Sequence, residues 1–180
     1  VGGPSVKPYQ PKGIWEEVSY GDKTFTAQYF EQDHGDALYR RSMYTFWKRQ
    51  SPPPSMLIFD APSREVCTAR RARTNTPLQA LALMNDPQFV EAARMLAERM
   101  MKEAGPDPLE RMSYAFQLAT ARKPAGEECT VLVDTFAAQL KTYRDKPDAA
   151  LELLSVGEAK RDESLDAAEL AAYTTIASMI

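Results

Sequence analysis

Histidine and cysteine are scarce in this sequence. The 180 residues include one histidine, His34, and two cysteines, Cys67 and Cys129, which lie far apart and form no C-x-x-C pair. A structural zinc site or a covalent haem attachment needs more of these side chains than the chain offers. We therefore expect no metal site and no cofactor in this chain. A disulfide between Cys67 and Cys129 stays open as an alternative to two free thiols.

Long apolar runs are also missing. No stretch of eighteen consecutive apolar residues occurs, so the sequence predicts no membrane span. The chain begins with Val1-Gly2-Gly3-Pro4 and shows no basic and apolar signal pattern there. We expect a segment of a longer polypeptide.

Positive charge is in slight deficit overall but unevenly distributed. The net charge is -3, whereas residues 36–75 carry eight Lys/Arg against three Asp/Glu, a net of +5, and residues 123–180 carry six against eleven, a net of -5. A basic face and an acidic face are expected, either folded against each other or serving different partners. Because nucleic-acid-binding domains are usually basic overall, we expect no nucleic acid as a partner.

The N-terminal part is rich in proline, glycine and aromatic residues. Residues 1–36 have the composition of an extended arm whose aromatic side chains dock onto the helical body, with a short strand around residues 24–30. Residues 37–75 form an irregular segment rich in arginine and proline. Within it, residues 40–49 and the apolar run at residues 56–59 are candidates for a short two-stranded ribbon, since three prolines, Pro52 to Pro54, favour extended geometry between them.

From residue 76 onward the sequence predicts helices. Thr76 is a good N-cap with Pro77 at the first helical position, and Leu78, Leu81 and Ala82 fall on one face. Further helices are expected over residues 87–103, from 108 to a break at Lys123-Pro124, around 129–143, over 147–154 and over 165–180. Their expected apolar stripes are Phe89, Ala92, Ala93, Leu96 and Met100, then Leu109, Met112, Phe116 and Ala119, then Cys129, Leu132, Val133, Phe136, Leu140 and Tyr143, and finally Leu165, Ala168, Ala172, Ile176 and Met179.

These elements predict a mainly α fold. We expect a bundle of about five or six helices over residues 76–180, preceded by the irregular region, with residues 1–180 forming a single domain.

Several motifs together resemble one known family. They are GGPSVKP (residues 2–8), DHG (33–35), YRRS (39–42), YTFWKR (44–49), SPPP (51–54), FDAP (59–62) and RTNTPLQAL (73–81). The chain resembles the planctomycete-specific C-terminal domain of unknown function numbered fifteen fifty-three, over nearly its whole length. The resemblance implies the C-terminal part of a large exported protein with cytochrome-c-like domains, and hence an extracytoplasmic location, at the periplasm or cell surface. It implies no catalytic residue.

Arginines are the densest polar feature of the sequence. Guanidinium groups beside a helix start suit a carboxylate, sulfate or phosphate, so they are candidates for an anion site. The competing interpretation is that they pair with nearby carboxylates and hold an irregular segment together. The candidate arginines are Arg40, Arg41, Arg64, Arg70, Arg71 and Arg73.

Three other features have a functional and a structural interpretation. His34 with Asp33 has the composition of a general-base pair, or of an axial haem ligand for a neighbouring domain, but a turn histidine is the simpler reading. Cys67 lies among arginines that favour a thiolate, yet no second histidine is available to activate it. A last group either forms a sugar-binding platform or packs as core: Tyr39, Tyr44, Phe46, Trp47 and Phe59.

Three functions follow from these patterns. The first is a non-enzymatic accessory or interaction domain that contacts neighbouring domains of the same polypeptide. The second is a hydrolase-like enzyme centred on His34, Asp33, Arg40, Arg41 and the Arg70–Arg73 cluster. The third is a domain that binds a small anion or an acidic polysaccharide through the same arginines and needs no His34.

Overall fold

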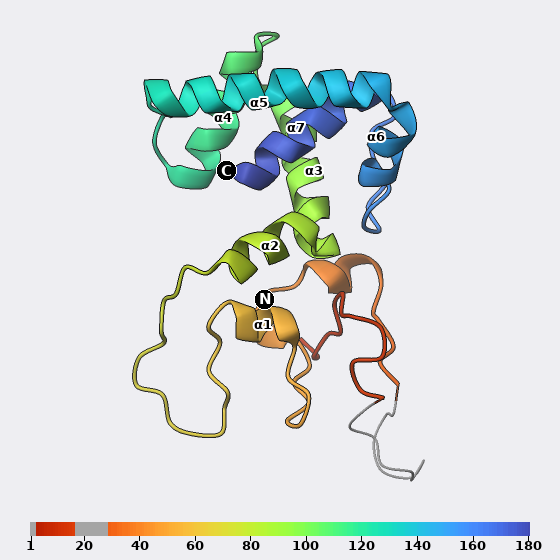
Figure 1. Cartoon of the computed structure of the whole chain (residues 1–180). Coiled ribbons are helices and arrows are strands. Elements are labelled where there is room, and N and C mark those ends of the chain that lie inside the picture. Colours follow the sequence, from red (N-terminus) through yellow and green to blue (C-terminus); the bar gives the residue numbers. More distant parts are fainter. Residues whose placement is uncertain (1–2, 17–28) are drawn as a thin grey trace. The chain divides into compact units, whose positions relative to one another are not determined.

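A computed structural model describes residues 3–16 and 29–180, and the chain divides into two compact units, Val1–Ala82 and Leu83–Ile180 (Figure 1). Helix α2, Pro77–Asn85, crosses the boundary between them. Helices are the main secondary structure of the described residues and form most of unit 2, which confirms the predicted mainly α class. That the two units act as one domain over residues 1–180 stays a prediction.

Unit 1 is mostly irregular and contains short helices. They are the 3₁₀ helices η1, Gly35–Tyr39, and η2, Ser42–Tyr44, followed by α1, Pro54–Ile58. Val6 in the N-terminal arm pairs with residues 44–46, where its N–H donates to the Tyr44 carbonyl at 2.8 Å and its carbonyl accepts from Phe46 N–H at 2.7 Å. The arm is therefore held by a short parallel bridge.

Trp15 organises the small core of unit 1. Its ring lies edge-on to Phe30 at 5.2 Å and to Phe46 at 5.5 Å between centroids, and only 4% of the residue is exposed. The ammonium groups of Lys7 and Lys48 lie over the same ring at 5.8 and 4.9 Å. An aromatic of the arm therefore docks, but its ring partners belong to unit 1 and not to the helical body onto which the composition predicted docking. Most of the strand expected at residues 24–30 lies outside the described residues.

The expected ribbon was wrong. Residues 56–59 lie in and just after α1, and in the described ranges strand-like pairing is limited to isolated bridges at Val6 and Thr45 and at Lys48 and Ser51. The reason is Pro54, which occupies the first turn of α1, where its missing N–H costs nothing and its fixed φ suits a helix. Pro52 and Pro53 remain outside the helix.

Unit 2 is a helical bundle. Its helices are α3, Pro87–Glu103; α4, Pro108–Thr120; α5, Gly126–Asp145; α6, Pro147–Leu154; and α7, Ala167–Met179. Asp86, Asp107 and Asp166 cap α3, α4 and α7 by accepting N–H bonds from the first turn. The helix starts expected at residues 87 and 108 are thus confirmed.

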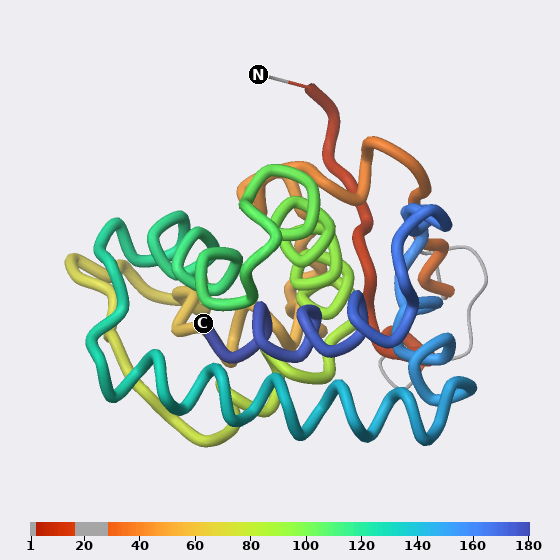
Figure 2. Tube along the Cα trace, turned by 90° about the horizontal axis from the view of Figure 1, so that it is seen from above, coloured from red at the N-terminus to blue at the C-terminus, as the bar shows by residue number. Residues whose placement is uncertain are grey.

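Helix α7 fills the centre of unit 2. It contacts α3, α5 and α6, and in Figure 2 it runs between α5 and α3. The Tyr173 ring stacks on Phe136 of α5 at 4.4 Å between centroids. Residues 170–174, Ile176 and Ala177 are all buried. The one-sided stripe expected for this helix was therefore wrong, because a helix in the centre of a bundle is covered on every side.

Some buried faces also differ from the expected stripes. In α3 the buried apolar residues are Val90, Ala93, Ala97 and Met100, and Ala92 is exposed. In α4, Met112 and Phe116 are buried as expected, whereas Leu109 is 41% exposed. In α2, Leu78 and Leu81 are 55% and 59% exposed, and the buried side chain is Gln79.

Candidate functional site

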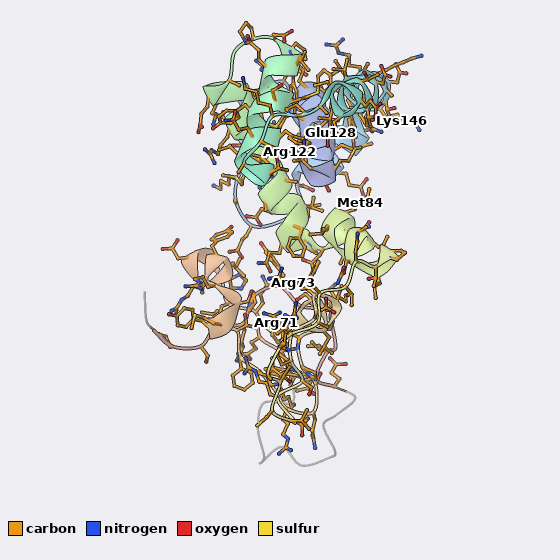
Figure 3. The ribbon with its side chains drawn as sticks, turned by 90° about the vertical axis from the view of Figure 1, so that its left-hand side faces the viewer. Arg71, Arg73, Met84, Arg122, Glu128 and Lys146 are labelled. Atoms are coloured by element: carbon orange, nitrogen blue, oxygen red, sulfur yellow. The ribbon has the colours of Figure 1, made fainter. Side chains whose placement is uncertain are left out.

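The candidate site lies in unit 1, beside the segment where the arginines concentrate. A pocket of about 620 Å³ is lined by residues 59–60, residues 70–74 and Gln79. Figure 3 labels Arg71 and Arg73 on this irregular segment. The pocket therefore brings together Arg70, Arg71 and Arg73 of the six candidate arginines.

The end of α1 forms one side of the pocket. The Ala61 N–H donates to the Met56 carbonyl at 2.8 Å and the Asp60 N–H donates to the Leu57 carbonyl at 3.2 Å, which is the Schellman pattern of a helix end. Asp60 occupies the left-handed position of this motif, with φ of 59°. Glycine is usual there, and Asp is among the few other residues that tolerate it.

The Asp60 carboxylate holds the segment that carries the arginines. Its Oδ2 accepts from Thr74 N–H at 2.8 Å, and the Thr74 hydroxyl donates to both carboxylate oxygens at 2.9 Å. The Thr74 N–H bond is the main cause of the lowered pKa of Asp60; the Thr74 hydroxyl acts in the same direction, desolvation opposes it, and Gln79 and Arg71 contribute less. Asp60 therefore stays ionised and fixes residue 74 against the end of α1.

Gln79 joins the same network from the first turn of α2. Its side-chain Nε2 donates to the Ile58 carbonyl and to Thr74 Oγ1, both at 2.9 Å. Its Oε1 accepts from Thr76 N–H at 3.1 Å, while Thr76 Oγ1 accepts from Gln79 N–H at 3.3 Å. The last two bonds form a capping box, which confirms Thr76 as the N-cap.

The three arginines of the pocket differ in how they are used. Arg71 donates from Nε to the Asp60 carbonyl and from Nη2 to the Phe59 carbonyl, each at 3.3 Å, so it satisfies carbonyls left open at the end of α1. Arg70 and Arg73 are exposed, and within the described ranges neither has a hydrogen-bond or ion-pair acceptor. Their guanidinium groups are available to an anion from solution.

The other candidate arginines lie outside the pocket lining. Arg40 donates to the Pro4 carbonyl at 2.7 Å and stacks over the Tyr44 ring at 4.1 Å. Arg64 stacks over the Trp47 ring at 4.4 Å. Arg41 is exposed. Arg40 and Arg64 therefore contact a backbone carbonyl and aromatic rings, whereas the structural interpretation named carboxylates as their partners.

His34 and Asp33 do not line the arginine pocket in the described part of the chain. The Asp33 carboxylate accepts from Lys7 N–H at 2.7 Å and thereby holds the N-terminal arm. His34 is exposed and precedes η1 as its N-cap. Catalysis by His34 stays a prediction.

The remaining sequence candidates are placed as follows. Cys67 is exposed and Cys129 half-buried, and both are free thiols. The described residues contain no group of three or more His, Cys, Asp or Glu that could hold a metal ion. No helix in residues 3–16 and 29–180 is long and apolar enough to cross a membrane.

The sequence did not predict the hydrogen-bond network in the pocket lining. Asp60, Thr74 and Gln79 were not expected to form a network, although two signals for it were present. The spacing Thr76-x-x-Gln79 is a capping-box pattern, and an aspartate that follows a short apolar run and precedes Ala-Pro fits a helix end.

The fold and the site define a mainly helical domain with an open, arginine-lined pocket. A family model described as PSD1, Protein of unknown function (DUF1553), matches residues 1–136, and the chain belongs to this family. The match covers unit 1 and continues into α5 of unit 2. No curated protein and no solved structure matches the chain.

Proposed function

We propose that this chain is a non-enzymatic accessory and interaction domain whose pocket holds an anionic group of its ligand. The observation that carries the proposal is the pair of exposed guanidinium groups, Arg70 and Arg73, in the pocket lining. Hydrogen bonds among Asp60, Thr74 and Gln79 hold another part of the same lining in place. Guanidinium forks bind carboxylate, sulfate and phosphate by paired hydrogen bonds.

The other polar side chains of the pocket are engaged in hydrogen bonds within the protein, which supports ligand binding rather than catalysis. In the described lining, the carboxylate is Asp60, and its oxygens accept from Thr74 and Gln79. A general acid or base must offer its proton or lone pair to a substrate, and Asp60 is engaged in the protein itself. Arg71 is likewise engaged with helix carbonyls.

We further propose that the domain works outside the cytoplasm, within a larger exported protein that also carries cytochrome-c-like domains. The support is the resemblance of the sequence motifs to the family. Neighbouring domains of the same polypeptide are then natural partners of the exposed surface.

A thermal-shift comparison tests anion binding. Sodium sulfate and sodium chloride are compared at equal ionic strength on the wild-type chain and on Arg70→Gln/Arg73→Gln. Weak sulfate binding is expected to raise the wild-type melting temperature by about 1 °C more than chloride does, and the double substitution should abolish this difference.

The matched control is Lys141→Gln/Arg144→Gln, which removes the same charge from exposed positions of α5. It should keep the wild-type response. An equal sulfate response in all three proteins would mean that sulfate acts through general salt effects, and the proposal would fail.

A further inference from the structure

The strength of the pocket's contacts limits which anions it can hold. Arg70 and Arg73 are exposed, and one exposed ion pair improves an equilibrium constant by at most about fivefold. Two such pairs on one small anion give a dissociation constant well above the millimolar range. A single sulfate, phosphate or carboxylate is therefore too weakly held to be a working ligand.

A ligand that repeats its charge overcomes this limit. When one anionic group is bound, the next group on the same molecule is present at a high effective concentration, and avidity gains of about a hundredfold or more follow without new contacts. Arg70 and Arg73 lie three residues apart, so their backbone atoms are separated by at most about 10 Å. Two neighbouring charges of a linear polymer suit this spacing.

The size and lining of the pocket also favour a ligand with an organic body. The pocket volume of about 620 Å³ lies in the range of sites for organic molecules and greatly exceeds the space one small anion fills. The half-buried Phe59 adds an apolar wall between polar groups. A sugar ring presents both an apolar face and hydroxyl groups to such a lining.

The spacing of charges separates two kinds of polyanion. Duplex DNA carries one charge per about 1.7 Å, much closer than the spacing available between Arg70 and Arg73, so most of its charges would find no partner in the pocket. A polysaccharide with one anionic group per sugar residue has fewer charges and can place them on the arginines alone.

We propose that the pocket binds a linear acidic polysaccharide at two points, with anionic groups of nearby sugar residues held by Arg70 and Arg73. This inference rests on the proposed anion-binding function and names its ligand class. The anionic group is a carboxylate or a sulfate ester, because both match the guanidinium fork.

Isothermal titration of the full chain at physiological ionic strength tests the inference. The probes are hexagalacturonate, galacturonate monomer, a fully methyl-esterified hexamer, a sulfated galactan hexamer and a single-stranded oligonucleotide with the same number of charges. At least one acidic hexamer should bind about a hundredfold more tightly than the monomer, and the esterified hexamer should not bind. The carboxylate and sulfate hexamers then distinguish the two sources of charge.

Variants connect this affinity to the pocket. Arg70→Gln and Arg73→Gln should each reduce binding of the preferred hexamer to about the monomer level, because either change leaves one point of attachment. Lys141→Gln/Arg144→Gln should bind as the wild type does. Since the substituted side chains are exposed, unchanged melting temperatures verify folding.

Three results would overturn the inference. They are equal affinity for monomer and hexamers, tighter binding of the oligonucleotide, and hexamer binding that survives both single substitutions. If the sulfate response depends on Arg70 and Arg73 but the hexamers bind no more tightly than the monomer, only the proposed ligand class is wrong. If the sulfate response and hexamer binding are both absent, the anion-binding function itself fails.

Discussion

Asp60 links the end of α1 to the segment that carries the pocket arginines. Its backbone adopts the left-handed conformation that ends the helix, with φ of 59°, while its side chain accepts from Thr74. Glycine would satisfy the backbone better but would leave the Thr74 N–H without this acceptor. A residue that does both has to be Asp or Asn, and the ionised carboxylate gives the stronger hydrogen bonds.

The Asp60 contacts predict a pH dependence of stability. Hydrogen bonds from Thr74 lower the pKa of Asp60 below its ordinary value of 3.8. A lowered folded-state pKa means that the stabilisation is fully present above about pH 4 and is lost as the pH falls through the folded pKa. Asp60→Asn keeps the backbone preference but carries no charge, so it should melt a few degrees below the wild type at pH 7.

Thermal unfolding at pH 7 and near pH 3 measures this effect. The difference between wild type and Asp60→Asn should shrink at the lower pH, because the Asp60 carboxyl of the unfolded chain is protonated there and the advantage of the ionised folded form decreases. A difference of the same size at both values would show that the charge of Asp60 contributes nothing. Asp36→Asn serves as the control, because Asp36 is an exposed carboxylate of the same unit.

At the residue scale, the sequence predicted six candidate arginines but not which of them share a pocket or how each is used. The density of arginine at residues 70–73 indicated an anion site, and three of these side chains do line one pocket. Arg71 donates to carbonyls at the end of α1, so its role depends on where that helix ends. The left-handed backbone of a single residue, Asp60, sets that position. Such a backbone conformation has only a weak signature in a sequence.

Among the elements, α3 carries a polar face that the apolar periodicity concealed. Arg94 is fully buried; its Nη1 lies 3.1 Å from Glu98 Oε1 and its Nη2 donates to the Ala159 carbonyl at 2.6 Å. The Glu91 carboxylate accepts from the N–H groups of Glu158 and Ala159 at 3.0 and 3.1 Å. These side chains hold the connection between α6 and α7.

Close packing at this connection also requires a glycine. Gly157 has φ of +90°, and a Cβ at this position would overlap the Glu91 carboxylate. Residues 157–164 have the charged composition that is typical of a solvated linker. Their backbone is instead bound by buried carboxylates and one arginine, because α3 provides acceptors and donors for it.

Removing the buried arginine should destabilise the chain strongly. Arg94→Met fills a similar volume but leaves the Glu98 carboxylate buried without its guanidinium partner, which costs about 3–5 kcal/mol. Urea unfolding monitored by circular dichroism measures the loss. Arg99→Met, which removes an exposed pair with Glu103, should change the midpoint little. Similar midpoints for the two variants would contradict this account of α3.

The sequence of helix α7 contains a signal for its burial that the expected one-sided stripe did not use. Alanine-rich sequences fit almost any stripe, so a one-sided pattern was easy to draw through it. After Glu169, however, no charged residue follows as far as Ile180. A helix without a charged face is typical of the centre of a bundle, and this rule predicts the observed position.

For the whole molecule, the two units differ in how they are stabilised. The large apolar cluster, from Ala93 to Ala177, lies entirely within unit 2, together with the capping residues of its helices. Among the described residues of unit 1, the buried apolar set is smaller and includes Val6, Trp15 and Leu38, and hydrogen bonds and stacked arginines add to it. We therefore expect unit 2 to fold without unit 1.

A fragment of residues 83–180 tests this expectation. It should show a helical circular dichroism spectrum and a cooperative thermal transition, because its core is complete. A fragment of residues 83–166, which lacks the central α7, should lose that transition. A featureless melting curve for the longer fragment would mean that unit 2 depends on the rest of the chain.

The central claim concerns the free guanidinium groups of unit 1, and nuclear magnetic resonance of the arginine Nε–Hε groups tests it most directly. Titration with hexagalacturonate, or with the sulfated galactan hexamer if calorimetry selects it, should shift the Arg70 and Arg73 signals with a common midpoint. The signals of Arg99 and Arg122, which are paired with Glu103 and Glu128, should stay in place. Unchanged Arg70 and Arg73 signals, or equal shifts of all arginines, would contradict a specific anion site in the pocket.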